Sequence, residues 1–449
     1  MTRTLSVWWE GAIVGTLQAN QHGEMRFAYA PEWLADPSRP AISFSLPKRP
    51  EPFKQRQCRP FFAGLLPEES QRDAIAGALG ISKRNDFAFL EALGGDVAGA
   101  LSLWPEGEAP PVPDPSGVPR PLSDDELVEV LNTLPKRPLL AGREGLRLSL
   151  AGAQTKLPVV LVDDRVALPA PGQPTTHILK LPIARIPHTT ENEALVMTLA
   201  AAVGLPVAPV AARTVGGRPY LLITRYDRRF DKSGRAHRLH QEDFCQALGI
   251  PPERKYAAED GPTLKAGFDL LRRATTVPAV AVLAFLDAAI FNLIVGNADA
   301  HGKNFSLLYQ AGGVTLAPFY DLLSTVAYPD LPPKLAMKIG QRATLEEIGP
   351  ATWPAFADDI GLAGPFVRRR VAELADAVVS HAPSIPDSRT LAGLDVAAVK
   401  EYSALIVSRA ERVPRMAAAP ASAASVRDMA TPDGPPTRAK SRKPKRRSS

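Results

Sequence analysis

The chain has 449 residues, of which 45% are hydrophobic and 22% are charged, a balance typical of a soluble globular protein of about two or three domains. It has two cysteines, Cys58 and Cys245, and no CxxC motif or His/Cys cluster. These features exclude a structural zinc site and favour a reducing compartment, which we expect to be the cytoplasm.

The formal net charge of +6 is concentrated at one end of the chain. Residues 438–449 carry seven basic residues and no acidic one, so removing these seven charges leaves −1 for the rest. Together with the Ala/Pro-rich stretch before them, they predict a disordered tail over residues 417–449. Such a tail either contacts nucleic acid or another acidic surface non-specifically, or stays solvated without a partner.

The first 104 residues predict a small α+β subdomain. Strands are expected at Leu5–Trp9, Ile13–Leu17, Met25–Tyr29 and Ile42–Leu46, where apolar and polar residues alternate between turns. Because the opening MTRTLSVWWEG lacks a long apolar region, we expect a strand there rather than a signal peptide.

Two helices complete this subdomain in the prediction. Pro67 precedes an apolar-periodic run that ends at Gly80, and a second helix is expected at Asp86–Leu93. Nothing in the first 104 residues suggests catalysis. The proline-rich segment 105–122 that follows predicts a semi-rigid linker.

A second group of strands is expected after the linker. A capping box at Ser123–Glu126 opens a helix that runs to about Leu134. Strands are then predicted at Leu146–Leu150, Leu157–Val162 and Ile178–Leu181. The turn between the first two strands is rich in small residues, which would let backbone amides approach a phosphate. Since it has a single glycine, an ordinary hairpin turn is the simpler interpretation.

A strand lysine and a helix glutamate follow in the order of a kinase ATP-positioning ion pair. Lys180 lies in the last of these strands, and a helix over Glu191–Val203 contains Glu193. The helix is expected to open with a capping box at Thr190–Glu193 and to stop at Gly204. Two interpretations of Glu193 therefore stay open, pairing with the lysine or capping its own helix.

The most informative stretch is residues 292–321. An apolar run over Val277–Ala298 leads directly into a polar loop, so we expect a buried core helix rather than a membrane span. The loop contains Asp299 and Asn304, and a Gly-Gly pair between the two strand-like runs after it predicts a hairpin. Asp321 follows the hairpin.

Two carboxylates and an amide beside a hairpin suit a hard divalent cation, which takes oxygen ligands and leaves positions for phosphate oxygens. Protein kinases use the same spacing: a catalytic Asp, a metal-binding Asn five positions later, and a second metal-binding Asp one hairpin further on. Asp299, Asn304 and Asp321 reproduce it. Turn chemistry, in which Asp and Asn side chains cap the backbone, explains such a loop equally well.

The small-residue turn, the strand lysine, the helix glutamate and the polar loop stand in kinase order, and here a family resemblance enters. The chain resembles the HipA family of bacterial serine/threonine kinases, the toxin halves of toxin–antitoxin pairs. The resemblance covers about residues 1–410. It is carried by LSLAGAQTKLPVVL, HILKLP, ENEALVMTLAAAVGLPV, LLITRYDR, LHQEDFCQALG, GNADAHGKNFSLLY and FYDLLST, and by FFAGLLPE in the N-terminal part.

The resemblance implies an α+β, bilobal protein-kinase-like fold with an additional small N-terminal α+β subdomain. The expected division is 1–104 for the subdomain, 105–122 for the linker, 123–226 for the kinase N-lobe, 227–416 for a mostly helical C-lobe and 417–449 for the tail. The hinge between the lobes would follow the strand Pro219–Thr224.

The resemblance also implies roles for single residues. Asp299 would be the catalytic base, Asn304 and Asp321 would bind Mg²⁺, and Lys180 would hold the ATP phosphates. The other expected nucleotide contacts are Ala151, Gly152, Ala153, Gln154, Thr155 and Lys156 at the phosphates, Thr224, Arg225 and Tyr226 at adenine, and His301, Gly302, Lys303 and Tyr320 in the rest of the pocket.

Regulation and partners are implied by the same resemblance. The family's inhibitory autophosphorylation serine falls on Ser149, an aminoacyl-tRNA synthetase is the expected protein substrate, and a helix-turn-helix antitoxin would provide indirect contact with DNA. One position departs from the family: a common glutamate at the hinge is Thr224 here, which matters little if backbone groups recognise adenine.

Two other functions remain as alternatives. Related folds phosphorylate small molecules, but such a substrate does not require the N-terminal subdomain. A non-catalytic co-repressor would act through its antitoxin and the basic tail, but the complete set Asp299, Asn304 and Asp321 argues against it. We therefore expect an ATP- and Mg²⁺-dependent protein kinase, with no membrane partner.

Overall fold

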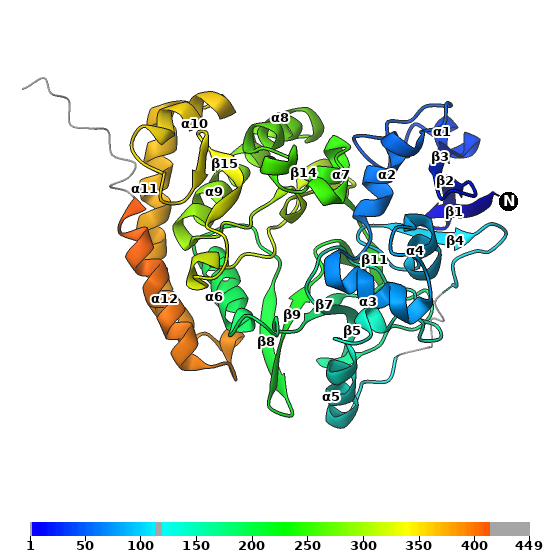
Figure 1. The fold of residues 1–449 in the computed structure, drawn as a ribbon, viewed down its shortest axis with the longest axis horizontal. Helices are drawn as coiled ribbons and strands as arrows, with labels where there is room; N and C mark the ends of the chain where they lie inside the picture. The colour runs from blue at the N-terminus through cyan, green and yellow to red at the C-terminus, as the bar shows by residue number, and fades with distance from the viewer. Residues whose placement is uncertain (1, 113–118, 414–449) are drawn as a thin grey trace, which may run out of the picture.

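The computed structural model describes residues 2–112 and 119–413, which form three regions (Figure 1). The N-terminal subdomain lies on the right of the view, a small sheet-containing lobe lies below the centre, and a larger helical lobe lies on the left. The tail predicted over 417–449 lies outside the described residues, as does the middle of the predicted linker.

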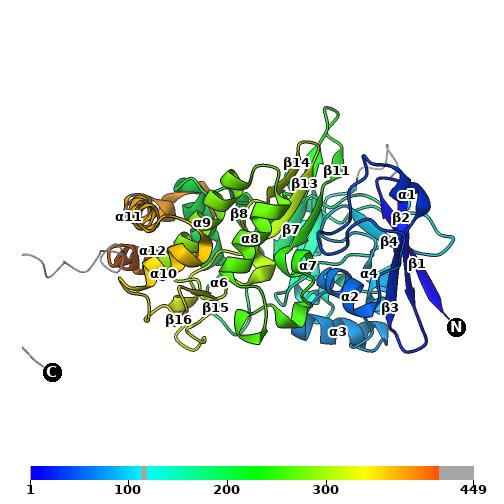
Figure 2. The ribbon, with the colours of Figure 1, turned by 90° about the horizontal axis from the view of Figure 1, so that it is seen from above.

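The N-terminal subdomain is built on a four-stranded antiparallel sheet in the order β3-β2-β1-β4. Its elements are β1 Arg3–Trp9, β2 Ala12–Ala19, β3 Met25–Tyr29, α1 Pro31–Ala35, α2 Gln55–Gly64, α3 Glu69–Leu79, α4 Asp86–Leu93 and β4 Leu101–Pro105. Figure 2 shows α2, α3 and α4 between this sheet and the rest of the molecule. Alternating apolar residues of β1 and β3, such as Leu5, Val7 and Phe27, form a core with Phe61 and Phe62 of α2.

The strand predicted at Ile42–Leu46 is wrong. This segment folds back on itself, with the Leu46 amide donating to the Ser43 carbonyl at 3.0 Å. The Tyr29 hydroxyl also donates to the Leu46 carbonyl and accepts the Ile42 amide. Ile42 and Leu46 are buried while Phe44 between them is exposed, and the backbone groups at Ile42 and Leu46 are satisfied by a turn and a tyrosine instead of a neighbouring strand.

The smaller lobe contains a five-stranded antiparallel sheet in the order β6-β5-β7-β9-β8. Its elements are α5 Asp124–Thr133, β5 Lys156–Val162, β6 Arg165–Ala167, β7 His177–Lys180, α6 Thr189–Ala202, β8 Val210–Val215 and β9 Arg218–Thr224. The predicted capping box at Ser123 is confirmed, since its side chain accepts from the Glu126 amide. The strand predicted at Leu146–Leu150 is wrong, because only Leu148 makes a bridge, to Asp96.

Helix α6 begins differently from the prediction. Its N-cap is His188, in a left-handed conformation, and no side chain caps the helix. The Thr189 hydroxyl accepts instead from the Ile183 amide, within the loop that leads into the helix. Glu193 is therefore free to point toward the sheet, and the predicted capping box at Thr190–Glu193 does not form.

The larger lobe combines helices with short antiparallel pairs of strands. Its elements are β10 Arg228–Phe230, β11 Ala236–Arg238, β12 His240–Asp243, α7 Phe244–Leu248, α8 Leu264–Ala274, α9 Pro278–Val295, β13 Ser306–Gln310, β14 Gly313–Leu316, β15 Lys334–Ile339, β16 Arg342–Thr344, α10 Thr352–Ile360, α11 Gly364–His381 and α12 Val396–Ala410. The larger lobe also contains the short 3-10 helices η2 Pro252–Arg254, η3 Ala257–Glu259, η4 Gly302–Asn304, η5 Thr325–Ala327, η6 Ala382–Asp387 and η7 Arg389–Leu391, whereas η1 Pro138–Leu140 comes earlier, between α5 and β5. The hairpin predicted before Asp321 is confirmed as β13 and β14, and β12 adds a third strand to it.

Helix α9 organises this lobe. By length and composition it could cross a membrane, yet 67% of it is buried inside the protein, and side chains such as Phe285, Phe291 and Ile294 belong to the largest core. Gly296, at φ 76°, ends the helix in a left-handed cap that turns the chain into the polar loop. The buried helix thus fixes the position of the residues that follow it.

Candidate active site

A cavity of about 370 Å³ lies where the three regions meet. Its walls come from the segment before α3, from the five-stranded sheet, and from the loop after α9. The predicted site residues that line it are Ala151, Gly152, Ala153, Gln154, Lys156, Lys180, Thr224, Arg225, Tyr226, Asp299, His301, Lys303, Asn304, Tyr320 and Asp321. Thr155, Gly302 and Ser149 were also predicted site residues but do not line the cavity.

Lys180 connects the two lobes. Its ammonium group lies 2.7 Å from Glu193 Oε1 on α6 and 2.6 Å from Asp321 Oδ1 after the hairpin. Burial alone would lower the pKa of Lys180, but the two carboxylates outweigh it and raise that pKa. The question left open by the sequence is thereby answered, because Glu193 pairs with the strand lysine and does not cap its helix.

Asp321 and Asn304 form the second part of the site. Asn304 Nδ2 donates to Asp321 Oδ2 at 2.8 Å, and Asn304 Oδ1 accepts the His301 amide. Although burial opposes ionisation, Lys180 holds the pKa of Asp321 well below its usual range. Asp321 also has a left-handed backbone, with φ 59°, which is strained for a residue other than glycine. Its carboxylate is therefore ionised and held in place.

Asp299 stands at the other side of the same loop. Its amide donates to Asn297 Oδ1, and Asn297 is fixed in turn by Asn292 of α9. Desolvation by the surrounding protein and the negative charge of Asp321 raise the pKa of Asp299 to about 6. Because Asp299 is exposed to the cavity, water screens part of this effect. A carboxylate that binds a proton near neutral pH is suited to act as a base.

The turn at residues 151–156 covers one end of the cavity. Gly152 has φ 104°, a conformation that favours glycine, and an added Cβ would lie 2.7 Å from the Lys156 Nζ. The Lys156 ammonium donates to the Ala151 carbonyl from beneath the turn. Burial and the positive charge of Lys180 lower the pKa of Lys156 to about 8. Lys156 at the end of the turn and Lys180, its register partner on β7, therefore lie next to the space that phosphates would occupy.

This turn is held by the N-terminal subdomain. Pro67 makes a parallel bridge with Gly152, and the Glu68 amide donates to the Gly152 carbonyl at 3.3 Å. Gln71 Nε2 donates to the Thr155 hydroxyl at 3.1 Å, which explains why Thr155 faces away from the cavity. The turn's position therefore depends on residues more than eighty positions earlier in the chain.

Ser149 lies directly before the turn and is fully buried. Its hydroxyl donates to the Leu65 carbonyl at 2.8 Å, and its amide donates to the Asp96 carbonyl at 2.9 Å. A phosphate could not be accommodated at this hydroxyl without moving the turn away from the subdomain, because a buried dianion needs space and compensating charge.

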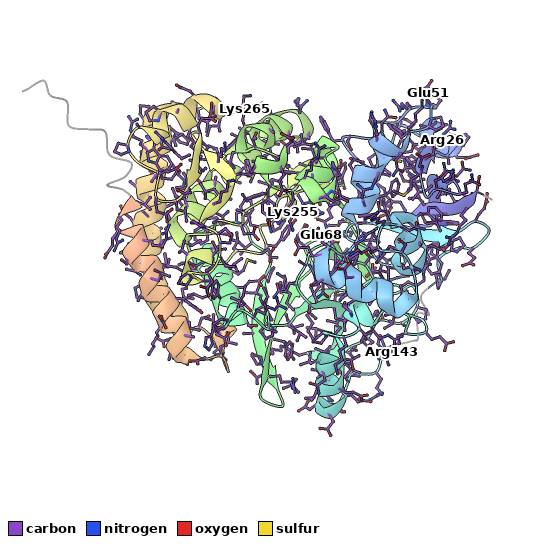
Figure 3. All side chains as sticks on the ribbon, viewed as in Figure 1. Arg26, Glu51, Glu68, Arg143, Lys255 and Lys265 are labelled. Carbon is purple, nitrogen blue, oxygen red and sulfur yellow. The ribbon has the colours of Figure 1, made fainter. Side chains whose placement is uncertain are left out.

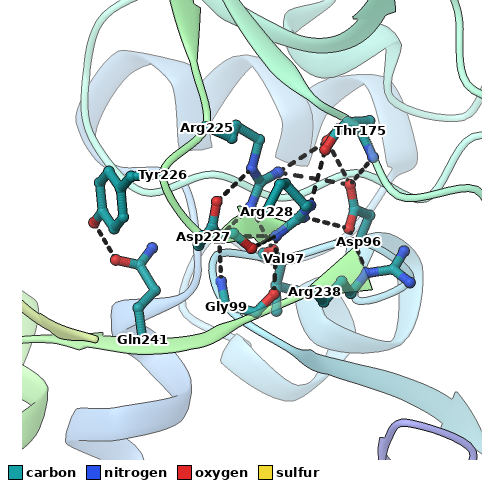
Figure 4. Close-up of polar contacts among 10 residues, drawn as sticks. All are labelled: Asp96, Val97, Gly99, Thr175, Arg225, Tyr226, Asp227, Arg228, Arg238 and Gln241. Carbon is teal, nitrogen blue, oxygen red and sulfur yellow. Dashed lines mark hydrogen bonds and ion pairs between the residues drawn. The ribbon is translucent and has the colours of Figure 1, made fainter. Parts of the chain in front are cut away.

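The hinge wall carries a buried group of charges (Figure 4). Asp96 of the N-terminal subdomain accepts from Arg228 and from Arg238 at 2.9 Å each, and from the Thr175 hydroxyl. Arg225 makes a bidentate pair with Asp227, at 2.9 and 2.7 Å. The guanidinium of Arg225 is therefore paired inside the protein, although Arg225 itself lines the cavity.

Aromatic side chains complete the pocket beside the hinge. The rings of Tyr226 and Tyr320 stack with centroids 5.6 Å apart. The Tyr320 hydroxyl donates to the Lys303 carbonyl, while Tyr226 donates to Gln241 (Figure 4). Burial and the positive charge of Lys255 lower the pKa of His301 to about 4, so this residue is neutral at neutral pH.

Two acidic residues of the N-terminal subdomain were missed by the sequence analysis. Glu68 and Glu69 line the cavity, so the N-terminal subdomain contributes acidic residues to its wall. Glu68 lies 3.0 Å from Lys255 and 3.5 Å from Lys303. Figure 3 labels Glu68 and Lys255 close together near the centre of the molecule. The phrase FFAGLLPE contained the signal, since Glu68 is its last residue.

The donor set fits a nucleotide-bound divalent cation. Within residues 2–112 and 119–413, no group of three or more His, Cys, Asp or Glu residues could hold a metal ion by itself. Asp321 and Asn304 together offer a carboxylate and an amide oxygen, and the remaining positions would be left for phosphate and water oxygens. This arrangement is typical of Mg²⁺ that binds together with ATP.

Comparison with known proteins agrees with this geometry. The sequence model of the HipA N-terminal domain matches residues 5–104, and that of the HipA-like C-terminal domain matches residues 148–384. The Y4mE protein of Sinorhizobium fredii is 57% identical over 415 residues, which cover 92% of this chain and 98% of that protein. The serine/threonine-protein kinase toxin HipA of Shewanella oneidensis is 30% identical over 371 residues, or 78% of this chain and 83% of that protein.

A solved structure confirms the fold. The complex of HipA, HipB and operator DNA from Shewanella oneidensis MR-1 contains a chain that superposes with a TM-score of 0.78 at 28% identity, covering 92% of this chain and 99% of that chain. The predicted α+β, kinase-like fold is therefore correct. With both domain models matched and the cavity residues in place, the chain belongs to the HipA family.

Proposed function

We propose that this protein is an ATP- and Mg²⁺-dependent serine/threonine protein kinase of the cytoplasm. One observation carries the proposal: Lys180, Glu193, Asp299, Asn304 and Asp321 converge from both lobes on one cavity. Family relatives are named kinases, which supports the reaction class.

Each residue has a defined part in the proposed reaction. Asp299 orients the acceptor hydroxyl and takes its proton as the oxygen attacks the γ-phosphorus. Lys180 neutralises phosphate charge while Glu193 holds its ammonium in position. Asn304 and Asp321 would hold Mg²⁺, which supplies electrostatic stabilisation of the transferring phosphoryl group when bound. The fixed geometry of these charges accounts for most of the expected rate.

The first test is mass spectrometry of the intact protein and of its peptides after incubation with ATP and Mg²⁺, with Asp299→Asn as the control. We expect one added phosphate on Ser149 in the wild type only. The burial of Ser149 against Leu65 suggests that this phosphate displaces the turn and limits activity. ATP binding without transfer to any protein would leave the kinase assignment unsupported.

The biological role proposed with this activity is that of a toxin in a toxin–antitoxin pair, with an aminoacyl-tRNA synthetase as substrate. Labelling of a purified synthetase by the wild type but not by Asp299→Asn is the expected result. Equal labelling by the inactive variant would contradict it. A small-molecule acceptor is the alternative in the same reaction class.

A DNA-binding partner is the second part of the proposal. The solved relative forms a complex with HipB and operator DNA, which favours a helix-turn-helix antitoxin here as well. Co-purification with the antitoxin, followed by operator binding of the complex, tests this point. Repression that persists in Asp299→Asn would show that the co-repressor role is separate from catalysis.

A further inference from the structure

The segment between α7 and α8 contains Tyr256. This segment contacts the catalytic loop, since the Gly302 amide donates to the Lys255 carbonyl. The Tyr256 hydroxyl donates to Asp299 Oδ1 at 3.1 Å. Its ring stands edge-on to His301, with centroids 5.4 Å apart and planes at 78°. Tyr256 and Asp299 both line the cavity. This hydrogen bond is therefore part of the cavity surface and not of the hydrophobic core.

An acceptor hydroxyl would make the same hydrogen bond. In protein kinases the catalytic-loop aspartate accepts the proton of the hydroxyl that is to be phosphorylated. The phenol of Tyr256 is itself a hydroxyl that donates to the carboxylate of Asp299. Any acceptor that approaches the same oxygen, whether a water molecule or a serine hydroxyl, must compete with it.

Neighbouring contacts fix the backbone that carries Tyr256. Lys255 pairs with Glu68 at 3.0 Å and with Glu69 at 3.2 Å. Glu253 pairs with Arg59 of α2, and one of these contacts measures 3.1 Å. The phenol is thus held at Asp299 by ion pairs to the N-terminal subdomain, rather than carried on a segment without tertiary contacts.

We propose that Tyr256 determines acceptor selectivity by occupying the acceptor position on Asp299. This rests on the proposed kinase activity. A water molecule brings no binding energy from other contacts, so it displaces the phenol poorly and ATP hydrolysis is slow. A docked protein makes contacts elsewhere that compensate for the lost hydrogen bond, and its hydroxyl then reaches the aspartate.

The transfer step itself is unchanged by this role. The acceptor oxygen forms a bond to the γ-phosphorus, its proton passes to Asp299, and the bond from the γ-phosphorus to the bridging oxygen breaks to release ADP. When water is the acceptor, the products are ADP and inorganic phosphate. Release of inorganic phosphate therefore measures how well water competes, separately from phosphate that is transferred to Ser149.

The test is the rate of phosphate release from ATP·Mg²⁺ by the full chain with no protein acceptor added. Tyr256→Phe removes only the hydroxyl and keeps the ring against His301. We expect phosphate release to rise roughly three- to tenfold, the size of one lost hydrogen bond, with the dissociation constant for ATP unchanged. Tyr402→Phe, the same change in α12 at a residue that does not line the cavity, is the matched control and should leave the rate unchanged.

Phosphate release by Tyr256→Phe that is equal to or slower than that of the wild type would overturn the inference, because a tyrosine that merely orients Asp299 lowers kcat when its hydroxyl is removed. A rise that persists when Asp299→Asn is added would overturn it as well. Absence of ATP binding in the wild type would instead remove the proposed function, and this result is obtained before any variant is compared.

Discussion

The carboxylates on the two sides of the cavity differ in burial and in pairing. At the hinge wall, Asp96 and Asp227 are buried, and each carboxylate is paired with arginines. At the floor, Asp299 is exposed and has a single tyrosine hydroxyl as its side-chain partner among the described residues. Charges that are fully paired and buried hold a structure together, whereas a charge left open to the cavity is free to exchange partners.

The largest expected effect on activity comes from replacing Asp299 at the floor of the cavity. Asp299→Asn removes the base and should lower phosphoryl transfer by at least about a thousandfold, while the thermal midpoint stays close to that of the wild type. Kinetics and a thermal melt of the same sample measure both quantities. A large loss of stability in this variant would mean that Asp299 also stabilises the fold. The contrast with the paired carboxylates of the hinge wall would then be wrong.

A substitution in the hinge wall should mainly lower stability. Asp96→Asn leaves three arginines without their shared carboxylate, and we expect a loss of about 3–5 kcal/mol in the free energy of unfolding. The matched control is Asp164→Asn, which removes an exposed pair with Arg213 and should change stability by less than about 1 kcal/mol. Similar values from denaturant unfolding of the two variants would contradict this interpretation of the wall.

The turn at residues 151–156 lies between these extremes. Gly152→Ala forces a Cβ into a left-handed backbone and toward the Lys156 ammonium, so ATP affinity should fall roughly tenfold. Gly77→Ala provides the control, because this glycine lies inside α3 with no atom near an added Cβ. Calorimetric titration with ATP should show a change for the first variant only.

The smallest effect is a pH dependence that distinguishes the two sides. Because the pKa of Asp299 is raised to about 6, the fraction of ionised base and hence the transfer rate should rise as pH increases through about 6 and level off above 7. Arginine neighbours oppose burial and hold the pKa of both Asp96 and Asp227 below the usual range, so the wall stays ionised over the same interval. A rate that is flat from pH 5 to 8 would show that Asp299 is not the titrating base.

The sequence was sufficient to predict which residues lie together when those residues are close in the chain. Asp299 and Asn304 are five positions apart and share one loop, so their spacing alone placed them together. The order of Lys180 and Glu193 suggested a pair, although only packing could show that His188 and not Thr190 begins the helix. Local patterns therefore predicted that Asp299 and Asn304 share one cavity, but they described the start of α6 poorly.

Residues that act across long sequence separations could not be found in this way. Glu68 reaches Lys255 over 187 positions, and Asp96 reaches Arg238 over 142, and neither belongs to a periodic pattern. Tyr256 lies in a segment of short 3-10 turns, where spacing carries little information. These contacts depend on how the N-terminal subdomain docks, which is a property of the whole fold.

The attachment of the turn at residues 151–156 to residues 65–71 has a consequence for protein synthesis. The cavity needs Leu65–Gln71 from the beginning of the chain and Asp321 from well beyond its middle. At roughly 5–20 residues per second, the ribosome takes about 13–50 s to add the intervening chain. A nascent chain therefore lacks the complete cavity until the segment that contains Asp321 has been made.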